Sequence, residues 1–446
     1  METTIIQTAW SKGKLLVKGG IIAFIALALT IPKLFVEELI QEREQRQKEA
    51  IAEVSDKWAG AQNITGPILV LPYKHALSDT TRRSYVKQYA YFLPDNLDIK
   101  ATMVPKEKHR GIYKVMLYTS TVNMKGSFND VNYQKLELVP EQILWDEAFV
   151  RMSLSDPRGL NEELALTWNG KTSVLTNEVG DSGGDVLVTP VELKGPEDLK
   201  KISFTTSSEI NGSQQLMFTP IGKSTTVELE SKWPHPSFTG NTLPQSSIIK
   251  DSGFTASWKS LSHKRNFPQQ WKNETSLLKH MQPNEHATGI NVSQASFGAS
   301  LFIPVNGYQK TMRSIKYALL CILLSFAAFF LIEVSQKNVS VHPFNYGLVG
   351  IALILFYTLL LSFSEYIGFN LAYLTASVFT IALIGWFVKD LLKSSRKAAL
   401  LSGVLVLLYI YIFTILQLQD YSLILGSIGL FLSLAVIMHF SKKFSW

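Results

Sequence analysis

The sequence predicts a membrane protein in which one N-terminal and five C-terminal transmembrane α-helices flank a large β-rich exported domain. Three observations support this fold class. Apolar runs of about 18 to 22 residues lie towards the two ends of the chain, long enough for helices to span a bilayer. Between them, short segments alternate apolar and polar residues, as half-buried strands do. Basic residues gather beside the apolar runs.

The net charge of +7 comes from the membrane flanks. Residues 37–311 contain 30 Lys and Arg against 31 Asp and Glu, so the middle of the chain is almost neutral. A nucleic-acid-binding domain would carry its basic residues there, so we expect no nucleic-acid partner. The single cysteine, Cys321, lies in an apolar run, where we expect a small packing or lipid-facing residue and no disulfide.

The first apolar run is predicted to be an uncleaved anchor. It follows Lys12, Lys14 and Lys18 and continues past a possible cleavage site at Ala26-Leu27-Ala28 as far as Val36. The predicted order along the chain is a cytoplasmic N-terminus (1–18), a transmembrane helix (19–36), a charged helical stalk (37–61), the β-rich domain (62–311), a five-helix transmembrane domain (312–440) and a cytoplasmic C-terminus (441–446).

The stalk reads as a helix because it contains i,i+4 pairs of opposite charge, Glu42–Arg46 and Glu44–Lys48. The apolar spacing of Ile51, Val54 and Trp58 predicts that its far end packs on the β-rich domain.

Many short strands about ten residues apart indicate a sandwich or a related β-rich architecture. Asn211-Gly212 predicts a hairpin between strands at 202–206 and 215–219. Helical segments are expected only at 196–199 and 276–280. The other predicted strands are 67–73, 82–92, 97–103, 113–122, 149–154, 164–168, 186–189, 225–231, 254–258 and 296–303.

Five further apolar runs predict the remaining spans: 312–333, 346–364, 371–388, 398–416 and 421–440. If the N-terminus is cytoplasmic, ten basic residues flank the spans on that side and four on the other, which obeys the positive-inside rule. The ten are Lys12, Lys14, Lys18, Lys337, Lys389, Lys393, Arg396, Lys397, Lys442 and Lys443; the four are Lys33, Lys310, Arg313 and Lys316. Both termini are therefore predicted to be cytoplasmic, and residues 37–311 to be exported.

The chain also resembles a known family over nearly its whole length. The residues that carry the resemblance include Thr65-Gly66-Pro67, Leu71-Pro72-Tyr73, Asp156-x-Arg158-Gly159, Trp233-Pro-His-Pro-Ser-Phe-Thr-Gly240, Gly253-Phe254-x-Ala256-x-Trp258, Arg313-x-Ile315-Lys316-Tyr317 and His342-Pro343-x-x-Tyr346. In these it is similar to the CreD family of bacterial inner-membrane proteins. The resemblance implies a cell-envelope integrity protein of the inner membrane whose biochemical activity is not defined. It offers no catalytic residues to carry over.

One stretch resembles an enzyme motif. Gly180-Asp181-Ser182-Gly183-Gly184 matches the nucleophile loop of trypsin-like proteases, but Asp185 follows it where that family has proline. No Ala-Ala-His-Cys stretch precedes it and no disulfides brace the fold, so we expect a glycine-rich turn before a strand. The histidines have no metal-binding spacing. We therefore expect no enzyme activity, no metal and no cofactor.

The remaining candidate functional residues are Trp233 and His235, Arg158, Glu333 and Glu365. Two prolines make the segment around His235 a rigid loop, which either packs or contacts a partner. Arg158 belongs to one of the motifs shared with the family. The two glutamates lie near the ends of predicted spans. The simpler interpretation places their side chains at the membrane–water interface, and the alternative is that they relay protons or a solute.

Two functions remain open on the sequence. The first is a non-enzymatic envelope protein whose exported domain senses, scaffolds or binds envelope material, with the lipid bilayer and periplasmic or envelope components as partners. The alternative is a transporter or a lipid-handling or envelope-precursor-handling protein that uses the five-helix block. A third hypothesis, an envelope hydrolase that uses Ser182, has the least support.

Overall fold

The computed structural model describes residues 17–76, 85–178, 186–273, 292–301, 307–336, 340–418 and 424–429, with three isolated residues at 431, 435 and 438. Contacts divide the chain into two compact units. The β-rich unit is Glu49–Pro304, and the helical unit joins Met1–Lys48 to Val305–Trp446.

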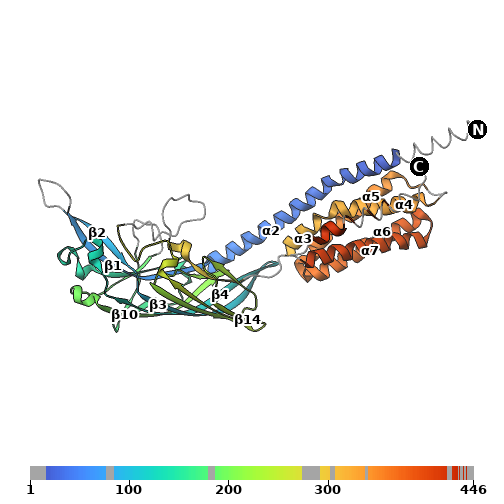
Figure 1. Cartoon of the computed structure of the whole chain (residues 1–446). Coiled ribbons are helices and arrows are strands. Elements are labelled where there is room, and N and C mark those ends of the chain that lie inside the picture. The colour runs from blue at the N-terminus through green and yellow to red at the C-terminus, as the bar shows by residue number, and fades with distance from the viewer. Residues whose placement is uncertain are drawn as a thin grey trace, which may run out of the picture. The chain divides into compact units, whose positions relative to one another are not determined.

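The β-rich unit contains two sheets (Figure 1). The nine-stranded sheet is built around β1, which pairs with three strands, β2, β5 and β11. Its main path is β13 (Pro236–Gly240), β17 (Phe297–Leu301), β11 (Gln215–Phe218), β1 (Gln62–Ala76), β5 (Phe149–Leu154), β9 (Val186–Pro190) and β8 (Thr176–Glu178); β2 (Tyr85–Phe92) pairs with β1, and β16 (Gln270–Lys272) with β2.

The eight-stranded sheet is antiparallel except for the parallel pair β12 and β3. Its order is β14 (Ser246–Lys250), β15 (Gly253–Leu261), β12 (Ser224–Ser231), β3 (Asn96–Arg110), β4 (Tyr113–Asn129), β10 (Lys201–Ser213), β6 (Ala165–Trp168) and β7 (Lys171–Val174). Short 3₁₀ helices connect strands at Tyr133–Leu136, Pro140–Gln142, Trp145–Glu147, Pro157–Gly159, Pro196–Leu199, Ser262–Lys264 and Val292–Ala295.

The two sheets share one hydrophobic core, as in a sandwich. In β3, Leu97, Ile99, Ala101 and Met103 are buried, while the residues that alternate with them are more exposed and face outward. This alternation is what the sequence pattern predicted, because successive side chains of a strand point to opposite faces. Each large side chain that becomes fully buried contributes about 1.5–3 kcal/mol.

The predicted hairpin at Asn211-Gly212 is wrong. Both residues lie inside β10, opposite Thr119 and Tyr118 of β4, and β11 belongs to the other sheet. Glycine is needed at 212 because a Cβ there would clash with the hydroxyl end of Tyr118. The turn comes two residues later, at Gln214, whose φ is 62°.

The helical unit begins with a helix from Val17 that turns at Leu29 and continues as α2 (Thr30–Trp58). Its buried residues include Ile22, Ala26 and Leu29, spaced four and three apart along one face. Leu29 lies over Gly350, where a Cβ would clash with it. The small residues at Gly347 and Gly350 thus allow this first helix to approach closely.

The other helices are α3 (Gly307–Ile315), α4 (Ala318–Val334), α5 (Pro343–Ile367), α6 (Phe369–Leu392) and α7 (Ser395–Gln417) (Figure 1). Among the described residues, four helices are long and apolar enough to span a membrane, and the bent pair α3–α4 would make five. Of the span predicted at 421–440, the structure describes only 424–429, 431, 435 and 438, so the count of six stays a prediction.

The span predicted at 312–333 is not one continuous helix. It begins inside α3, and the chain bends by 45° before α4. The Tyr317 N–H donates to the Ser314 carbonyl at 3.0 Å, an i,i+3 bond that tightens the turn. Lys316, at the break, is exposed. A buried lysine would be costly at this place, which explains why the apolar run does not continue unbroken.

Candidate functional site

Glu333 is a buried carboxylate with three partners in the helical unit. Glu333 lies near the end of α4, and only 4% of its surface is exposed. It forms an ion pair with Lys18 of the first helix. The Tyr346 hydroxyl donates to Oε2 at 2.7 Å, and the Val341 N–H donates to Oε1 at 2.8 Å. The carboxylate therefore joins the first helix, the end of α4 and the start of α5.

The surroundings of Glu333 are rigid. The Tyr346 ring stacks on Phe329, with centroids 4.5 Å apart, and meets Phe326 edge-on at 5.6 Å. A buried ion pair contributes little net stability, but removing one partner leaves an unpaired buried charge and costs several kcal/mol. This geometry suits a charge that holds three helices together.

Glu365 lies near the opposite end of α5 and is half-buried. The Tyr308 hydroxyl of α3 donates to its Oε1 at 2.9 Å. Since Tyr346 and Glu365 are separated by 19 positions on one helix, they lie about 28 Å apart along its axis. The structure therefore does not bring Glu333 and Glu365 into one site.

Trp233 and His235 lie in the segment just before β13, as the prolines predicted. The Trp233 Nε1–H donates to the carbonyl oxygen of His235 at 2.9 Å. Trp233 is partly buried against the core, whereas the His235 side chain is exposed. Pro236 is the first residue of β13, an edge strand, where the missing N–H costs no ladder bond. Packing on the core explains Trp233.

Arg158 lies at the junction between the end of α2 and the strands of the β-rich unit. Its Nε and Nη2 donate to the two carboxylate oxygens of Asp156, each at 2.8 Å, and Nη1 donates to the Asp56 carbonyl at 2.9 Å. Asp156 also accepts the Gly60 N–H at 2.8 Å. The Arg158 guanidinium holds the pKa of Asp156 below its usual value. These contacts fix the segment at the end of α2, at Asp56 and Gly60, against Asp156 and Arg158.

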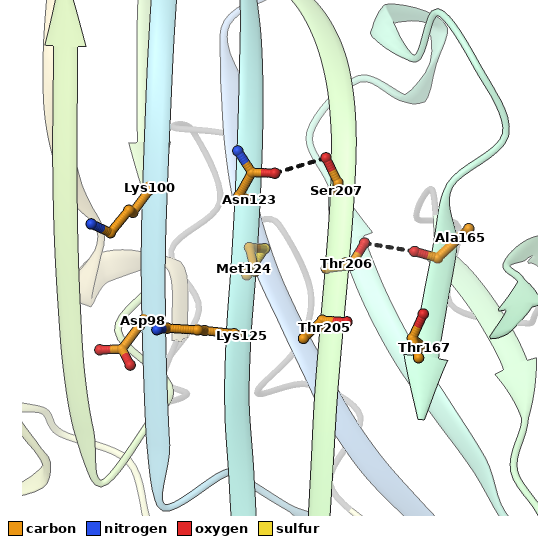
Figure 2. A pocket seen from close by; sticks show the side chains of 10 residues that line it. All are labelled: Asp98, Lys100, Asn123, Met124, Lys125, Ala165, Thr167, Thr205, Thr206 and Ser207. Atoms are coloured by element: carbon orange, nitrogen blue, oxygen red, sulfur yellow. Dashed lines mark hydrogen bonds between the residues drawn. The ribbon is translucent and has the colours of Figure 1, made fainter. Parts of the chain in front are cut away.

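A concavity of about 460 Å³ lies on the eight-stranded sheet and was not predicted (Figure 2). Four strands line it, and most of the lining side chains alternate with buried core residues, so they point away from the core. The lining residues are Asp98 and Lys100 of β3, Asn123, Met124 and Lys125 of β4, Thr205, Thr206 and Ser207 of β10, and Ala165 and Thr167 of β6.

Strand register arranges these side chains in two rows. Lys100, Asn123 and Ser207 lie opposite one another, and the Ser207 hydroxyl donates to Asn123 Oδ1 at 2.8 Å. The neighbouring row contains Asp98, Lys125, Thr205 and Thr167. Hydroxyl, amide, ammonium and carboxylate groups thus share one surface. The alternation of polar residues was visible in the sequence, but which strands would be neighbours was not.

Ser182 and its glycine-rich loop lie outside the described residues. In the part of the chain that the structure describes, no group of three His, Cys, Asp or Glu side chains could hold a metal ion. Cys321 is buried and free, as expected of a packing residue.

The comparison with known proteins decides the family. A family model described as "Inner membrane protein CreD" matches residues 14–446. The chain belongs to the CreD family. A curated CreD relative, the inner membrane protein CreD of Escherichia coli (strain K12), is 29% identical over 433 residues, covering 94% of this chain and 91% of the relative. The resemblance seen in the sequence is thereby confirmed. CreD is a family of inner-membrane proteins and not a known enzyme family.

The motifs that carried the CreD resemblance have structural contacts. Asp156 and Arg158 form the junction described above. His342 caps α5, since its Nδ1 accepts the Phe344 N–H at 3.2 Å, and Pro343 occupies the first helical position, where proline is favoured. Tyr346, at the end of the same motif, binds Glu333. In this CreD-family chain, these motif residues make contacts at the ends of helices and between separate segments of the chain.

Proposed function

We propose that this CreD-family protein supports the cell envelope without catalysis, by binding a polar envelope component on the exported face of its β-rich unit. The observation that carries the proposal is the polar concavity on the eight-stranded sheet. Its two rows of hydroxyl, amide and charged groups match the hydroxyl, amide and carboxylate groups of an envelope glycan. One solvated face is ordinary for an antiparallel sheet; a hollow that gathers seven polar side chains provides a place to bind.

The charges in the concavity are largely balanced by charged neighbours within the protein. Lys100 lies 2.9 Å from Glu228, whose carboxylate raises the pKa of the lysine. Lys125 lies directly across from Asp98. Because both lysines have acidic neighbours, the surface is close to neutral, and hydrogen bonding contributes more to recognition than net charge.

The proposed location of this surface is the periplasm, with both termini in the cytoplasm. The distribution of basic flanking residues supports this orientation, ten against four. Labelling in spheroplasts tests it, starting from Cys321→Ser, which removes the only cysteine. A membrane-impermeant maleimide should label Thr121→Cys in intact spheroplasts and Lys393→Cys only after lysis. Both positions are exposed, and the reverse pattern would overturn the orientation.

Binding is tested with the full-length protein in nanodiscs and purified peptidoglycan glycan strands as the probe. Thr205→Trp fills the concavity and should weaken binding by roughly tenfold, about 1.4 kcal/mol. Thr255→Trp is the matched control, because it places the same side chain outward on the same sheet but outside the lining. Equal binding by wild type and Thr205→Trp would reject the site.

A second candidate function is transport or the handling of a lipid or envelope precursor by the helical unit. The observation that favours it is the buried carboxylate of Glu333, since ionisable groups among membrane helices often mark a pathway. Under this function, Glu333→Gln and Glu365→Gln abolish an envelope phenotype while the protein stays folded and abundant. If both variants support normal envelope resistance, the helical unit has no such relay.

A further inference from the structure

The short helix α3 has two different sides. Tyr308, Thr311 and Ser314 are buried on the inner side, which faces α5, α6 and α7. Lys310 and Arg313 are half-buried, and Lys316, in the turn that follows, is exposed. At 3.6 residues per turn, Lys310 and Arg313 lie about 60° apart around the helix, and Lys316 follows in the turn directly after it. They form one basic face on the outer side of the helix.

No carboxylate compensates this basic face in the part of the chain that the structure describes. None of Lys310, Arg313 and Lys316 forms an ion pair there. Lys310 approaches the Gln417 amide oxygen at 3.4 Å and the Phe369 ring at 5.5 Å, so its stem lies along the protein with its charge at the edge. Glu365 is the nearby acid, and it accepts a hydrogen bond from Tyr308 on the inner side.

The place of this face relative to the bilayer follows from the bend. Because α3 turns by 45° from α4, it leaves the direction of the span at its end, where the lipid head groups lie. Of the four basic residues that flank the spans on the proposed periplasmic side, Lys33 pairs with Glu37 at 2.6 Å. The other three are the basic face of α3. The positive-inside rule disfavours such charges on this side, so they need a local counter-charge.

We propose that the basic face of α3 binds the phosphate group of an anionic phospholipid in the adjoining leaflet. The Arg313 guanidinium can hold phosphate oxygens with two parallel N–H bonds, and the two ammonium groups add point charges. The lipid acyl chains then lie against the apolar surfaces of the neighbouring helices. The site recruits a lipid to one end of the helical unit, independently of what the β-rich unit binds.

The test measures which lipid surrounds α3 in the full-length protein. Gln309→Cys in a Cys321→Ser background carries a bimane fluorophore beside the basic face, since Gln309 is exposed. The protein is reconstituted in phosphatidylcholine vesicles with 10 mol% phosphatidylglycerol, and quenching by head-group spin-labelled phosphatidylglycerol is compared with quenching by equally labelled phosphatidylcholine. We expect a preference for the anionic lipid of roughly fivefold for each basic side chain, until the lipids beside α3 are saturated.

Replacing all three residues (Lys310→Gln, Arg313→Gln, Lys316→Gln) should bring the two quenching values close to parity. The matched control is Lys389→Gln, Lys393→Gln, Arg396→Gln, which removes three basic residues from the other membrane face and should keep the preference. A preference that survives the α3 substitutions would overturn the proposal. So would its loss on adding millimolar inorganic phosphate at constant ionic strength, because the site would then bind free phosphate.

Discussion

The long helix between Val17 and Trp58 is held near each end by an ion pair, and the two pairs have different surroundings. At its start, Lys18 pairs with the buried carboxylate of Glu333, inside the helical unit. Beyond its end, Arg158 pairs with Asp156 in the β-rich unit, and the Arg158 side chain is 62% exposed. The carboxylate of the first pair accepts a hydrogen bond from Tyr346, whose ring packs on Phe326, whereas the second pair opens to water and also binds a backbone carbonyl.

The two pairs contribute to stability in different ways because one is buried and the other is exposed to water. In the enclosed site, each charge depends on the other, because neither can be solvated once its partner is removed. In the open site, water can solvate Asp156 if Arg158 is removed, so the loss of the ion pair costs less. The main contribution of Arg158 there is to connect Asp156 with the Asp56 carbonyl.

Lys18→Met should destabilise the helical unit by about 3–5 kcal/mol, because it leaves the Glu333 carboxylate buried without its counter-charge. Adding Glu333→Gln should recover part of that loss, since the amide oxygen still accepts from Tyr346 or Val341 and the double variant contains no unpaired charge. Denaturant unfolding of the purified protein in detergent measures both. If the double variant is as unstable as the sum of the single variants, the two residues are not coupled.

Gly350→Leu should cost about 1–3 kcal/mol by overpacking, because a side chain there meets Leu29 and Phe326. Disulfide cross-linking between the first helix and α5 would show the displacement directly. Gly403→Leu is the matched control, since no atom lies within 4 Å of the added Cβ. A similar loss in both variants would indicate a general intolerance of leucine at helical glycines.

Arg158→Gln should destabilise the β-rich unit by about 1–2 kcal/mol near neutral pH, because Asp156 loses its charged donors. The arginine lowers the pKa of folded Asp156 below the ordinary value of 3.8, so its contribution is present above that pH and lost as the pH falls through the lower, folded value. The stability difference between variant and wild type should therefore shrink below about pH 4. A difference that stays constant from pH 7 to pH 3 would contradict this.

Glu365→Gln should change stability by less than about 1 kcal/mol, because the Tyr308 hydroxyl can donate equally well to an amide oxygen. Glu333→Gln should cost more in the same assay, since it removes the charge that Lys18 needs. Equal effects of the two variants would show that the two glutamates have equivalent surroundings.

The strands were predictable where alternation was regular, because a half-buried strand fixes which residues face the core. The segment 149–154 is β5 with the same bounds. The failure at Asn211-Gly212 has a physical reason: the same glycine that favours a turn also allows Tyr118 to approach the backbone. A dipeptide cannot distinguish these two uses. The break at Lys316 was likewise visible only as two basic residues, Arg313 and Lys316, at the start of a long apolar stretch.

The sites were less predictable, because they depend on residues far apart in the chain. Glu333 was identifiable as a costly charge near a span end, but Lys18 lies 315 positions away, and no local pattern connects them. The concavity depends on the register of β3, β4, β10 and β6, which the sequence of any one strand does not specify. Arg158 was recognisable by family resemblance, while its contacts with Asp56 and Asp156 required the fold.

The strand order has a consequence for biogenesis. In the nine-stranded sheet, the first strand, β1, lies beside β11, and β11 in turn lies beside β17, the last strand of the unit. The sheet cannot be completed until Leu301 has been synthesised, just before α3 begins at Gly307. Pairings this distant in sequence form slowly and leave strand edges open in the meantime. A nascent chain of this protein therefore leaves an edge of β11 unpaired until β17 has been synthesised.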